Sequence, residues 1–156
     1  MIRKAELKDV PQIGMLLEQI YQVHAELRPD FLKISGGRKY SDEEVRQMLD
    51  GAEKPIFVYV DNDDTVQAYL FCQIQETKGK PNMVDCKVLY IDDICVDGNY
   101  RGQGIGERLM DYAKEVAKEN ACSKLTLNVW NDNHSAVRFY ERLGMRAFQT
   151  TMEMDV

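Results

Sequence analysis

Histidine, tryptophan and positive charge are scarce in this 156-residue chain, and it contains no long apolar run. There are two histidines, one tryptophan and four prolines, and 26 acidic residues outnumber 20 basic ones, for a formal net charge of −6. Proteins that hold nucleic acid through its phosphates need a basic face, which this composition does not favour. We therefore expect no nucleic-acid partner.

Potential metal ligands are few and scattered. His24 and His134 are far apart and have no cysteine at ligand spacing, so we expect no metal.

The start of the chain, MIRKAELKDV, has neither the apolar core of a signal peptide nor a membrane-spanning run. With no CxxC pair among the cysteines, these absences predict a cytoplasmic protein without a membrane partner. The four cysteines are Cys72, Cys86, Cys95 and Cys122.

Periodicity and turn formers divide the chain into alternating elements. Two capping-box patterns, Asp9 with Gln12 and Ser41 with Glu44, predict helix starts, and turn-forming DNDD between two β-rich runs predicts a hairpin. The order of elements indicates one mixed α/β domain over residues 1–156. We expect strands at 2–5, 55–60, 65–77, 86–96, 124–130 and 146–154, and helices at about 9–27, 42–51, 105–119 and 133–144.

The segment YRGQGIGERLM, residues 100–110, places glycine at 102, 104 and 106, between a strand end and a helix start. Backbone N–H groups at a helix start point outward and favour an anion, and Arg101 adds a permanent charge suited to phosphate. We expect the missing side chains to let a phosphate approach the backbone. A dinucleotide fingerprint would need glycine where Glu107 stands, and a P-loop would need Gly-Lys-Ser/Thr. A glycine turn without a ligand is the alternative.

Two signatures in this chain resemble those of the GNAT superfamily of acetyl-CoA-dependent N-acyltransferases. RGQGIG matches R/Q-x-x-G-x-G/A, and NVWNDNHSAVRFYERLGMRA is similar to N-x-x-A-x-x-F-Y-x-x-x-G-F, with Met145 in the last position. The resemblance implies a central mixed, mostly antiparallel sheet flanked by helices, with a splay between two strands for the coenzyme A arm. The matched positions are Arg101, Gly104, Gly106, Asn133, Ala136, Phe139, Tyr140 and Gly144.

The same resemblance implies that acetyl-CoA is a co-substrate. Loop amides at about 103–106 would hold its pyrophosphate, and the strand edge at 94–96 would pair with its pantetheine arm like an added strand. Asn133, Ala136 and Tyr140 share one face of the late helix. The residues expected to bind coenzyme A are Ile94, Cys95, Val96, Arg101, Gly102, Gln103, Gly104, Ile105, Gly106, Asn133, Ala136 and Tyr140.

The expected reaction is direct attack of a primary amine on acetyl-CoA in a ternary complex. Such an amine, with a pKa near 10.4, is almost wholly protonated at pH 7, so its proton needs a route out. Strand alternation places Asp92 and Asp93 on opposite faces, and we favour Asp92, acting through water. The identity of the base stays open, because Asn128 stands where some relatives have a glutamate. The resemblance implies that the Val96 N–H, on a bulged strand, stabilises the oxyanion and that Tyr140 protonates the thiolate.

Other interpretations stay open. Cys95 could carry the acetyl group, although no histidine base is near it in sequence and mid-strand cysteines are usually buried hydrophobes. The alternative outside enzymes is a non-catalytic acyl-CoA-binding module that acts as a sensor or interaction unit; Tyr140 counts against it.

Residues 27–40 are expected to wall the acceptor site. The acceptor is not identified, and a homodimer stays open. Acidic residues that could attract a cationic acceptor are Glu26, Asp30, Asp61, Asp63 and Asp64.

Overall fold

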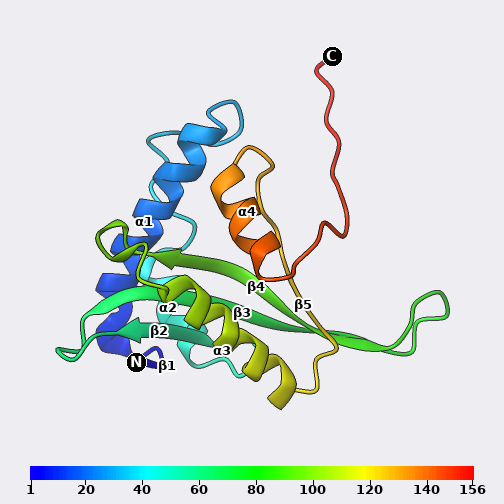
Figure 1. Cartoon of the computed structure of the whole chain (residues 1–156), viewed down its shortest axis with the longest axis horizontal. Helices are drawn as coiled ribbons and strands as arrows, with labels where there is room; N and C mark the ends of the chain where they lie inside the picture. Colours follow the sequence, from blue (N-terminus) through cyan, green and yellow to red (C-terminus); the bar gives the residue numbers. More distant parts are fainter.

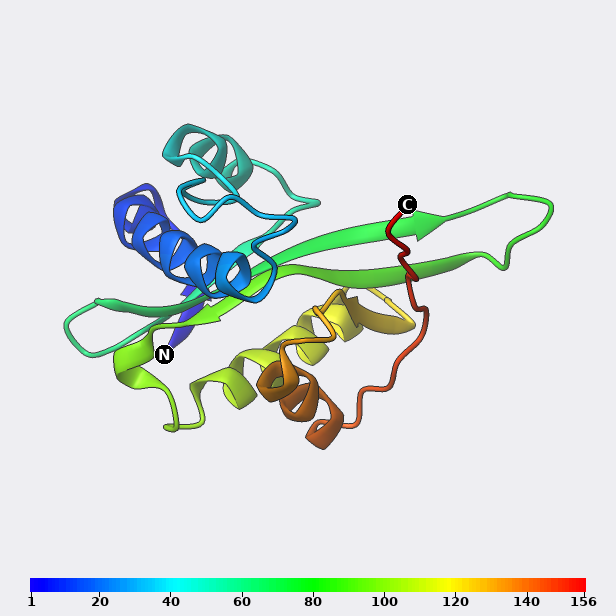
Figure 2. The ribbon, with the colours of Figure 1, turned by 90° about the horizontal axis from the view of Figure 1, so that it is seen from above.

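A computed structural model describes residues 1–156 and centres on a five-stranded sheet in the order β1-β2-β3-β4-β5. The first four strands pair antiparallel in succession, and β5 lies parallel to β4. Figure 2 shows the sheet from its edge, with α1 and α2 on one face and α3 and α4 on the other. The mixed, mostly antiparallel sheet flanked by helices is therefore confirmed. The elements are β1 (Ile2–Lys4), α1 (Val10–Leu27), α2 (Asp42–Leu49), β2 (Ile56–Val60), β3 (Val66–Thr77), β4 (Cys86–Val96), α3 (Ile105–Glu119), β5 (Lys124–Leu127) and α4 (His134–Arg142), with short 3₁₀ turns at Leu7–Asp9 and Gly98–Tyr100.

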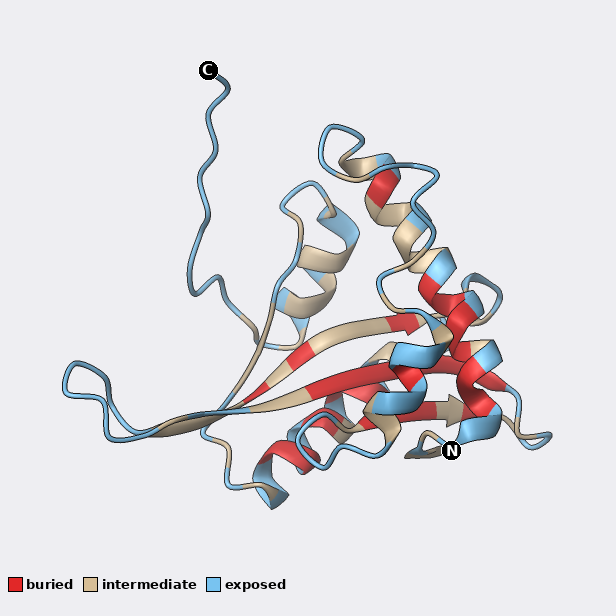
Figure 3. Ribbon diagram, turned by 180° about the vertical axis from the view of Figure 1, so that it is seen from behind, coloured by how far each residue is buried: buried red, intermediate tan, exposed pale blue.

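Each face of the sheet has its own apolar core. Side chains of successive strand residues point to opposite faces, so Tyr69 and Phe71 of β3 pack with α1 and α2, whereas Leu70 and Cys72 pack with α3. Buried residues follow β2, β3 and the inner stripes of α1 and α3, while the tip of the β3–β4 hairpin is exposed (Figure 3). No helix combines the length and the apolar character needed to cross a membrane.

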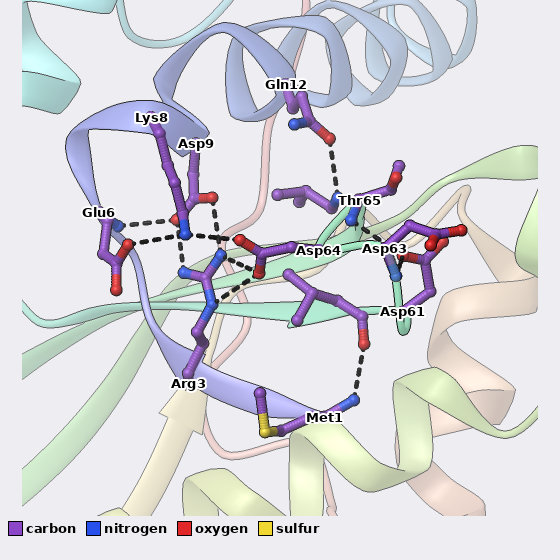
Figure 4. Close-up of polar contacts among 12 residues, drawn as sticks. Met1, Arg3, Glu6, Lys8, Asp9, Gln12, Asp61, Asp63, Asp64 and Thr65 are labelled. Atoms are coloured by element: carbon purple, nitrogen blue, oxygen red, sulfur yellow. Dashed lines mark hydrogen bonds and ion pairs between the residues drawn. The ribbon is translucent and has the colours of Figure 1, made fainter.

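An ion-pair network ties the start of the chain to the β2–β3 turn (Figure 4). The Arg3 guanidinium donates to both carboxylate oxygens of Asp9, at 2.7 and 2.9 Å, and also to Asp64 at 2.7 Å. Asp9 is 1% exposed, and its carboxylate also accepts the N–H of Glu6 at 2.8 Å. Both carboxylate oxygens of Asp9 therefore already accept hydrogen bonds from residues that precede α1.

This network explains why one predicted capping box is wrong. The side chain of Asp9 makes no cap hydrogen bond to α1, and the Gln12 side-chain oxygen instead accepts the N–H of Val66 on β3, at 2.7 Å. Burial beside an arginine thus took precedence over local capping. The second box, Ser41 with Glu44, is confirmed at the start of α2, with both reciprocal hydrogen bonds present.

The C-terminal part of the chain departs from the sequence prediction. The strand expected at 124–130 ends at Leu127, and the strand expected at 146–154 is not formed. After α4 the chain leaves the body as an extended tail (Figure 1), and residues 146–156 make no backbone hydrogen bond. A strand exists only in a ladder, and this segment has the strand pattern without a ladder partner.

Candidate active site

A cavity of about 410 Å³ opens where β4 ends, between α1, α4 and the loop that leads into α3. Ile20 and Val23 of α1 form part of its wall. Every residue predicted to bind coenzyme A lines this cavity except Gln103. The structure therefore brings together the strand edge, the glycine loop and the α4 signature, which are separate in the sequence.

The expected splay between β4 and β5 is present beside this cavity. The two strands pair along only four residues each, so β4 has no neighbour on that side at 94–96. The N–H of Asp97 donates to the Gln67 carbonyl of β3 at 2.9 Å. Because successive N–H groups in a strand point to opposite edges, the Val96 N–H points to the open side. The open edge can thus accept an added strand-like ligand.

Backbone conformation and helix packing explain the three glycines of the loop. Gly102 and Gly104 have φ of +76° and +75°, a region that side chains disfavour, and a Cβ on either would meet nothing within 4 Å. At Gly106 a Cβ would lie 3.2 Å from the Phe139 ring of α4. The turn therefore favours glycine at 102 and 104, and contact with α4 favours it at 106; close approach of a phosphate to this backbone stays a prediction.

The backbone amides of this loop are unpaired. The N–H groups of residues 102–107 donate no hydrogen bond within the chain, and the first bond of α3 runs from the Arg108 N–H to the Gly104 carbonyl at 3.1 Å. Arg101 Nε donates to the Val96 carbonyl at 3.1 Å, which holds the guanidinium beside the loop. Free amides at a helix start next to an arginine fit a phosphate group, as in other anion sites.

The α4 residues occupy the opposite wall of the cavity. Asn133 caps the helix: its side-chain oxygen accepts the Ala136 N–H at 3.3 Å and the Ser135 hydroxyl at 3.2 Å. Its NH₂ group remains for a ligand. Burial, followed by the negative charge of Asp93, raises the pKa of Tyr140 to about 12. The phenol is therefore neutral at physiological pH and can act as a donor.

A bulge in β4 corrects the prediction that Asp92 and Asp93 face opposite sides of the sheet. Ile91 pairs with Cys72, and Asp93 pairs with Phe71, so Asp92 is an extra residue in the ladder. Directly opposed residues share a face, which places Asp93 on the α1 side with Phe71. The resemblance implied that the strand carrying Val96 is bulged, and β4 has its bulge at Asp92.

The side chain of Asp92 also lies on the α1 side, where two residues hold it. The Tyr40 hydroxyl donates to its carboxylate at 2.6 Å, and the Lys39 ammonium lies 3.0 Å from the same oxygen. The Tyr40 ring stacks on Phe71. Both residues belong to the segment 27–40 that was expected to wall the acceptor site, but their contacts with Asp92 were not predicted. Tyr40 precedes the Ser41 cap and, with Val45 of α2, fits the hydrophobic staple that often accompanies a helix start.

Asp93 has no ion-pair partner, and its environment is different. Burial raises the pKa of its carboxyl to about 6, with the nearby charge of Lys39 acting in the opposite direction. Burial also raises the pKa of the Cys95 thiol to about 12. This thiol therefore stays protonated at neutral pH, which disfavours the route in which Cys95 carries the acetyl group.

The acidic residues considered for attracting a cationic acceptor are largely engaged elsewhere. Asp64 pairs with Arg3, Asp30 pairs with Arg28 at 2.7 Å, and Asp61 accepts two N–H groups in the β2–β3 turn. Glu26 accepts the Gln22 amide. They do not form one free acidic surface.

Comparisons with known proteins agree with this geometry. A tetramutant of the BH1408 protein from Bacillus halodurans, a solved structure, is 29% identical, with a TM-score of 0.95 over 100% of this chain and 99% of that one. An uncharacterized N-acetyltransferase of Lactobacillus delbrueckii subsp. lactis is 27% identical over 149 residues, 83% of this chain and 85% of that protein. Thialysine N-epsilon-acetyltransferase of Sus scrofa is 43% identical over 58 residues, and this match spans only about a third of either protein, 37% of this chain and 34% of the pig enzyme. The sequence pattern of the acetyltransferase (GNAT) family matches residues 17–145, and the chain belongs to that family.

Proposed function

We propose that this protein transfers the acetyl group of acetyl-CoA to a primary amine by direct attack in a ternary complex. The observation that carries the proposal is the row of unpaired amides at 102–107 beside Arg101, in one cavity with an open strand edge and Tyr140. The amides and Arg101 would hold the diphosphate, and the edge at 94–96 would pair with the pantetheine amides.

The chemistry requires a C–N bond to form as the C–S bond of the thioester breaks. The amine loses one proton to a base, and the leaving thiolate gains one. The Val96 N–H, which points to the open edge, would donate to the oxyanion that develops on the carbonyl oxygen. Tyr140, whose phenol carries its proton at pH 7, would supply that proton to the thiolate.

We propose Asp93 as the base, in place of Asp92. The Tyr40 hydroxyl and the Lys39 ammonium both contact the same carboxylate oxygen of Asp92, so this side chain is already engaged within the chain. Asp93 shares the α1 face, forms no ion pair, and has a pKa that burial raises to about 6. A carboxylate with a pKa nearer to neutrality is the better general base, acting directly or through one water.

The relatives support an amine as the acceptor. The pig relative carries thialysine in its name and the Lactobacillus relative is called an N-acetyltransferase, which supports an amine acceptor for this chain.

Four free thiols suit a reducing compartment, and we propose a cytoplasmic location on that ground.

Ligand-dependent stability followed by turnover tests this function. Acetyl-CoA at about 100 times its dissociation constant should stabilise the fold by about 2.7 kcal/mol, measured as a higher melting temperature. Release of free thiol is then followed with polyamines, aminoglycosides, amino acids and peptide N-termini as acceptors. No stabilisation by acetyl-CoA or coenzyme A would refute the site, and binding without turnover on any amine would favour a non-catalytic module.

A further inference from the structure

The hydroxyl of Tyr69, on β3, is buried in the core beneath α1 without a hydrogen-bond partner. The side chain is 0% exposed, and its ring packs edge-on against that of Phe71, with the ring centres 5.0 Å apart. Phenylalanine would fill the same space without burying a polar atom. Because nearly every buried polar group in a native protein has a partner, an exception points to a role outside packing.

The β3–β4 ladder places the carboxyl of Asp93 beside this hydroxyl. Asp93 pairs with Phe71, and Tyr69 lies two residues before Phe71, so Tyr69 and Asp93 are diagonal neighbours on the α1 face. Diagonal neighbours are close enough for long side chains to meet. Burial raises the pKa of Tyr69 well above its ordinary value, and the charge of Asp93 adds to this rise. Contact with the hydroxyl in turn lowers the pKa of Asp93, against the larger effect of burial.

Two tyrosines pack on the Phe71 ring, and each approaches a different carboxylate. The Tyr40 ring stacks on Phe71 with the ring centres 5.8 Å apart, and its hydroxyl donates to Asp92 at 2.6 Å. Tyr69 meets the same ring edge-on, and its hydroxyl lies beside Asp93. Because the bulge turns both carboxylates to the α1 side, the negative charge of Asp92 opposes the ionisation of Asp93. The second charge therefore needs a donor of its own.

The other titratable groups around Asp93 do not supply that donor. The Lys39 ammonium contacts Asp92 and acts on Asp93 through its charge alone. The Cys95 thiol and the Tyr140 hydroxyl feel the charge of Asp93 without a hydrogen bond to it, and both line the cavity assigned to coenzyme A. Among these groups, the Tyr69 hydroxyl is the one free to donate to Asp93. The buried residues that α1 adds to this core are apolar: Val10, Ile13, Leu16 and Leu17.

We propose that Tyr69 is a positioning residue for Asp93: its hydroxyl donates to the carboxylate once the proton is lost, and so holds the charged side chain in one orientation. The inference rests on the proposed function, in which Asp93 takes the proton of the amine. A hydrogen bond to a charged carboxylate is stronger than one to a neutral carboxyl, so the hydroxyl gains its partner when Asp93 ionises. Tyr69 does not line the coenzyme A cavity and acts on the reaction through Asp93.

Titration of Asp93 in the full chain tests this contact without any acceptor. The chemical shift of its side-chain carboxyl carbon is followed by NMR, with Asp93→Asn to assign the signal. In Tyr69→Phe we expect the pKa of Asp93 to rise from about 6 to about 7 or above, because one charge-assisted hydrogen bond is lost. The acidic limb of kcat/KM for an amine substrate should move upward with it. A shifted titration with an unmoved limb would uphold the contact and refute Asp93 as the base.

The melting temperature separates this role from packing. Tyr69→Phe should melt no lower than the parent at pH 4, where Asp93 keeps its proton in both proteins, and lower than the parent at pH 8, where the lost hydrogen bond matters. Tyr59→Phe is the matched control, because it removes a phenol hydroxyl from the α3 side of the sheet, where that hydroxyl accepts from Arg108. It should leave the Asp93 titration unchanged. The inference is overturned if Tyr69→Phe titrates like the parent, if Tyr59→Phe moves the titration equally, or if the difference in melting temperature is the same at both pH values.

Discussion

Lys39 contacts Asp92 at two points: its ammonium donates to the backbone carbonyl at 2.9 Å and lies 3.0 Å from the carboxylate. The segment that leads into α2 is thereby fixed to the β4 bulge. The same positive charge opposes the effect of burial on Asp93. Lys39 thus acts on two neighbouring carboxylates, by direct contact on one and through its electric field on the other.

Replacing Lys39 by methionine should move the acidic limb of the pH–rate profile upward. Without the ammonium, the pKa of Asp93 rises beyond about 6, so the base is protonated over a wider range of pH. The measurement is kcat/KM for the preferred amine between pH 5 and 9. Lys39→Arg keeps the charge and should leave the limb in place. An unchanged limb in Lys39→Met would contradict the assignment of Asp93 as base.

Asp93→Asn should stabilise the protein while lowering its activity. A raised pKa means that the native state binds more protons than the unfolded state between the ordinary 3.8 and about 6, so stability falls as pH rises through that window. An amide cannot ionise, and the gain at pH 7 should approach about 3 kcal/mol in urea denaturation and vanish near pH 3. Loss of general-base catalysis should lower kcat by about 10² or more. Asp92→Asn, which leaves Asp93 intact, is the comparison for activity, and a variant of Asp93 with parental kcat would rule out its role.

Tyr140→Phe separates proton donation from packing. The ring and its contact with Phe139 are kept, so the fold and acetyl-CoA affinity should be preserved. We expect kcat to fall by about 10², the lower end for general acid catalysis, because a thiol of pKa near 8.5 is already a fair leaving group. Calorimetry for affinity and steady-state kinetics check this. If Tyr140→Phe had the parental kcat, the hydroxyl would have no catalytic role.

Arg101→Ala should weaken coenzyme A binding by about ten- to a hundredfold and leave the affinity for pantetheine, which has no diphosphate, unchanged. The reason is that one charge-assisted contact to phosphate contributes roughly 1.5 to 3 kcal/mol. Isothermal titration with both ligands makes the comparison. Arg101→Lys keeps the charge and should recover part of the affinity. Equal weakening toward both ligands would mean that Arg101 acts through its bond to the Val96 carbonyl instead.

Gly104→Ala should destabilise the fold by about 1 kcal/mol because φ there is +75°. Gly104→Asn should cost less, since asparagine tolerates the left-handed region better than other side chains. Urea denaturation gives the difference. Equal stability of the alanine variant and the parent would show that the turn can be rebuilt without glycine.

The motifs predicted which residues meet at one cavity, whereas periodicity did not predict the ladder of β4. Arg101 and the loop glycines, and Asn133 with Tyr140, lie in one cavity because each signature fixes a local shape, a turn or a helix face. Local patterns do not encode which strand residue is unpaired, so the resemblance implied a bulged strand but not that its bulge is at Asp92. The ties of Lys39 and Tyr40 to β4 span about fifty residues, a separation that no local pattern reports.

The bulge also determines where β4 tolerates a change in length. Ile91 faces the α3 side of the sheet and Asp93 faces the α1 side. If Asp92 were deleted, β4 would therefore continue as a regular strand, and each later residue would keep its present face. Deleting any residue that has a ladder partner would instead turn the following side chains over. Evolution or engineering could therefore add or remove this one carboxylate by a single-codon insertion or deletion, without moving the loop and helix that follow.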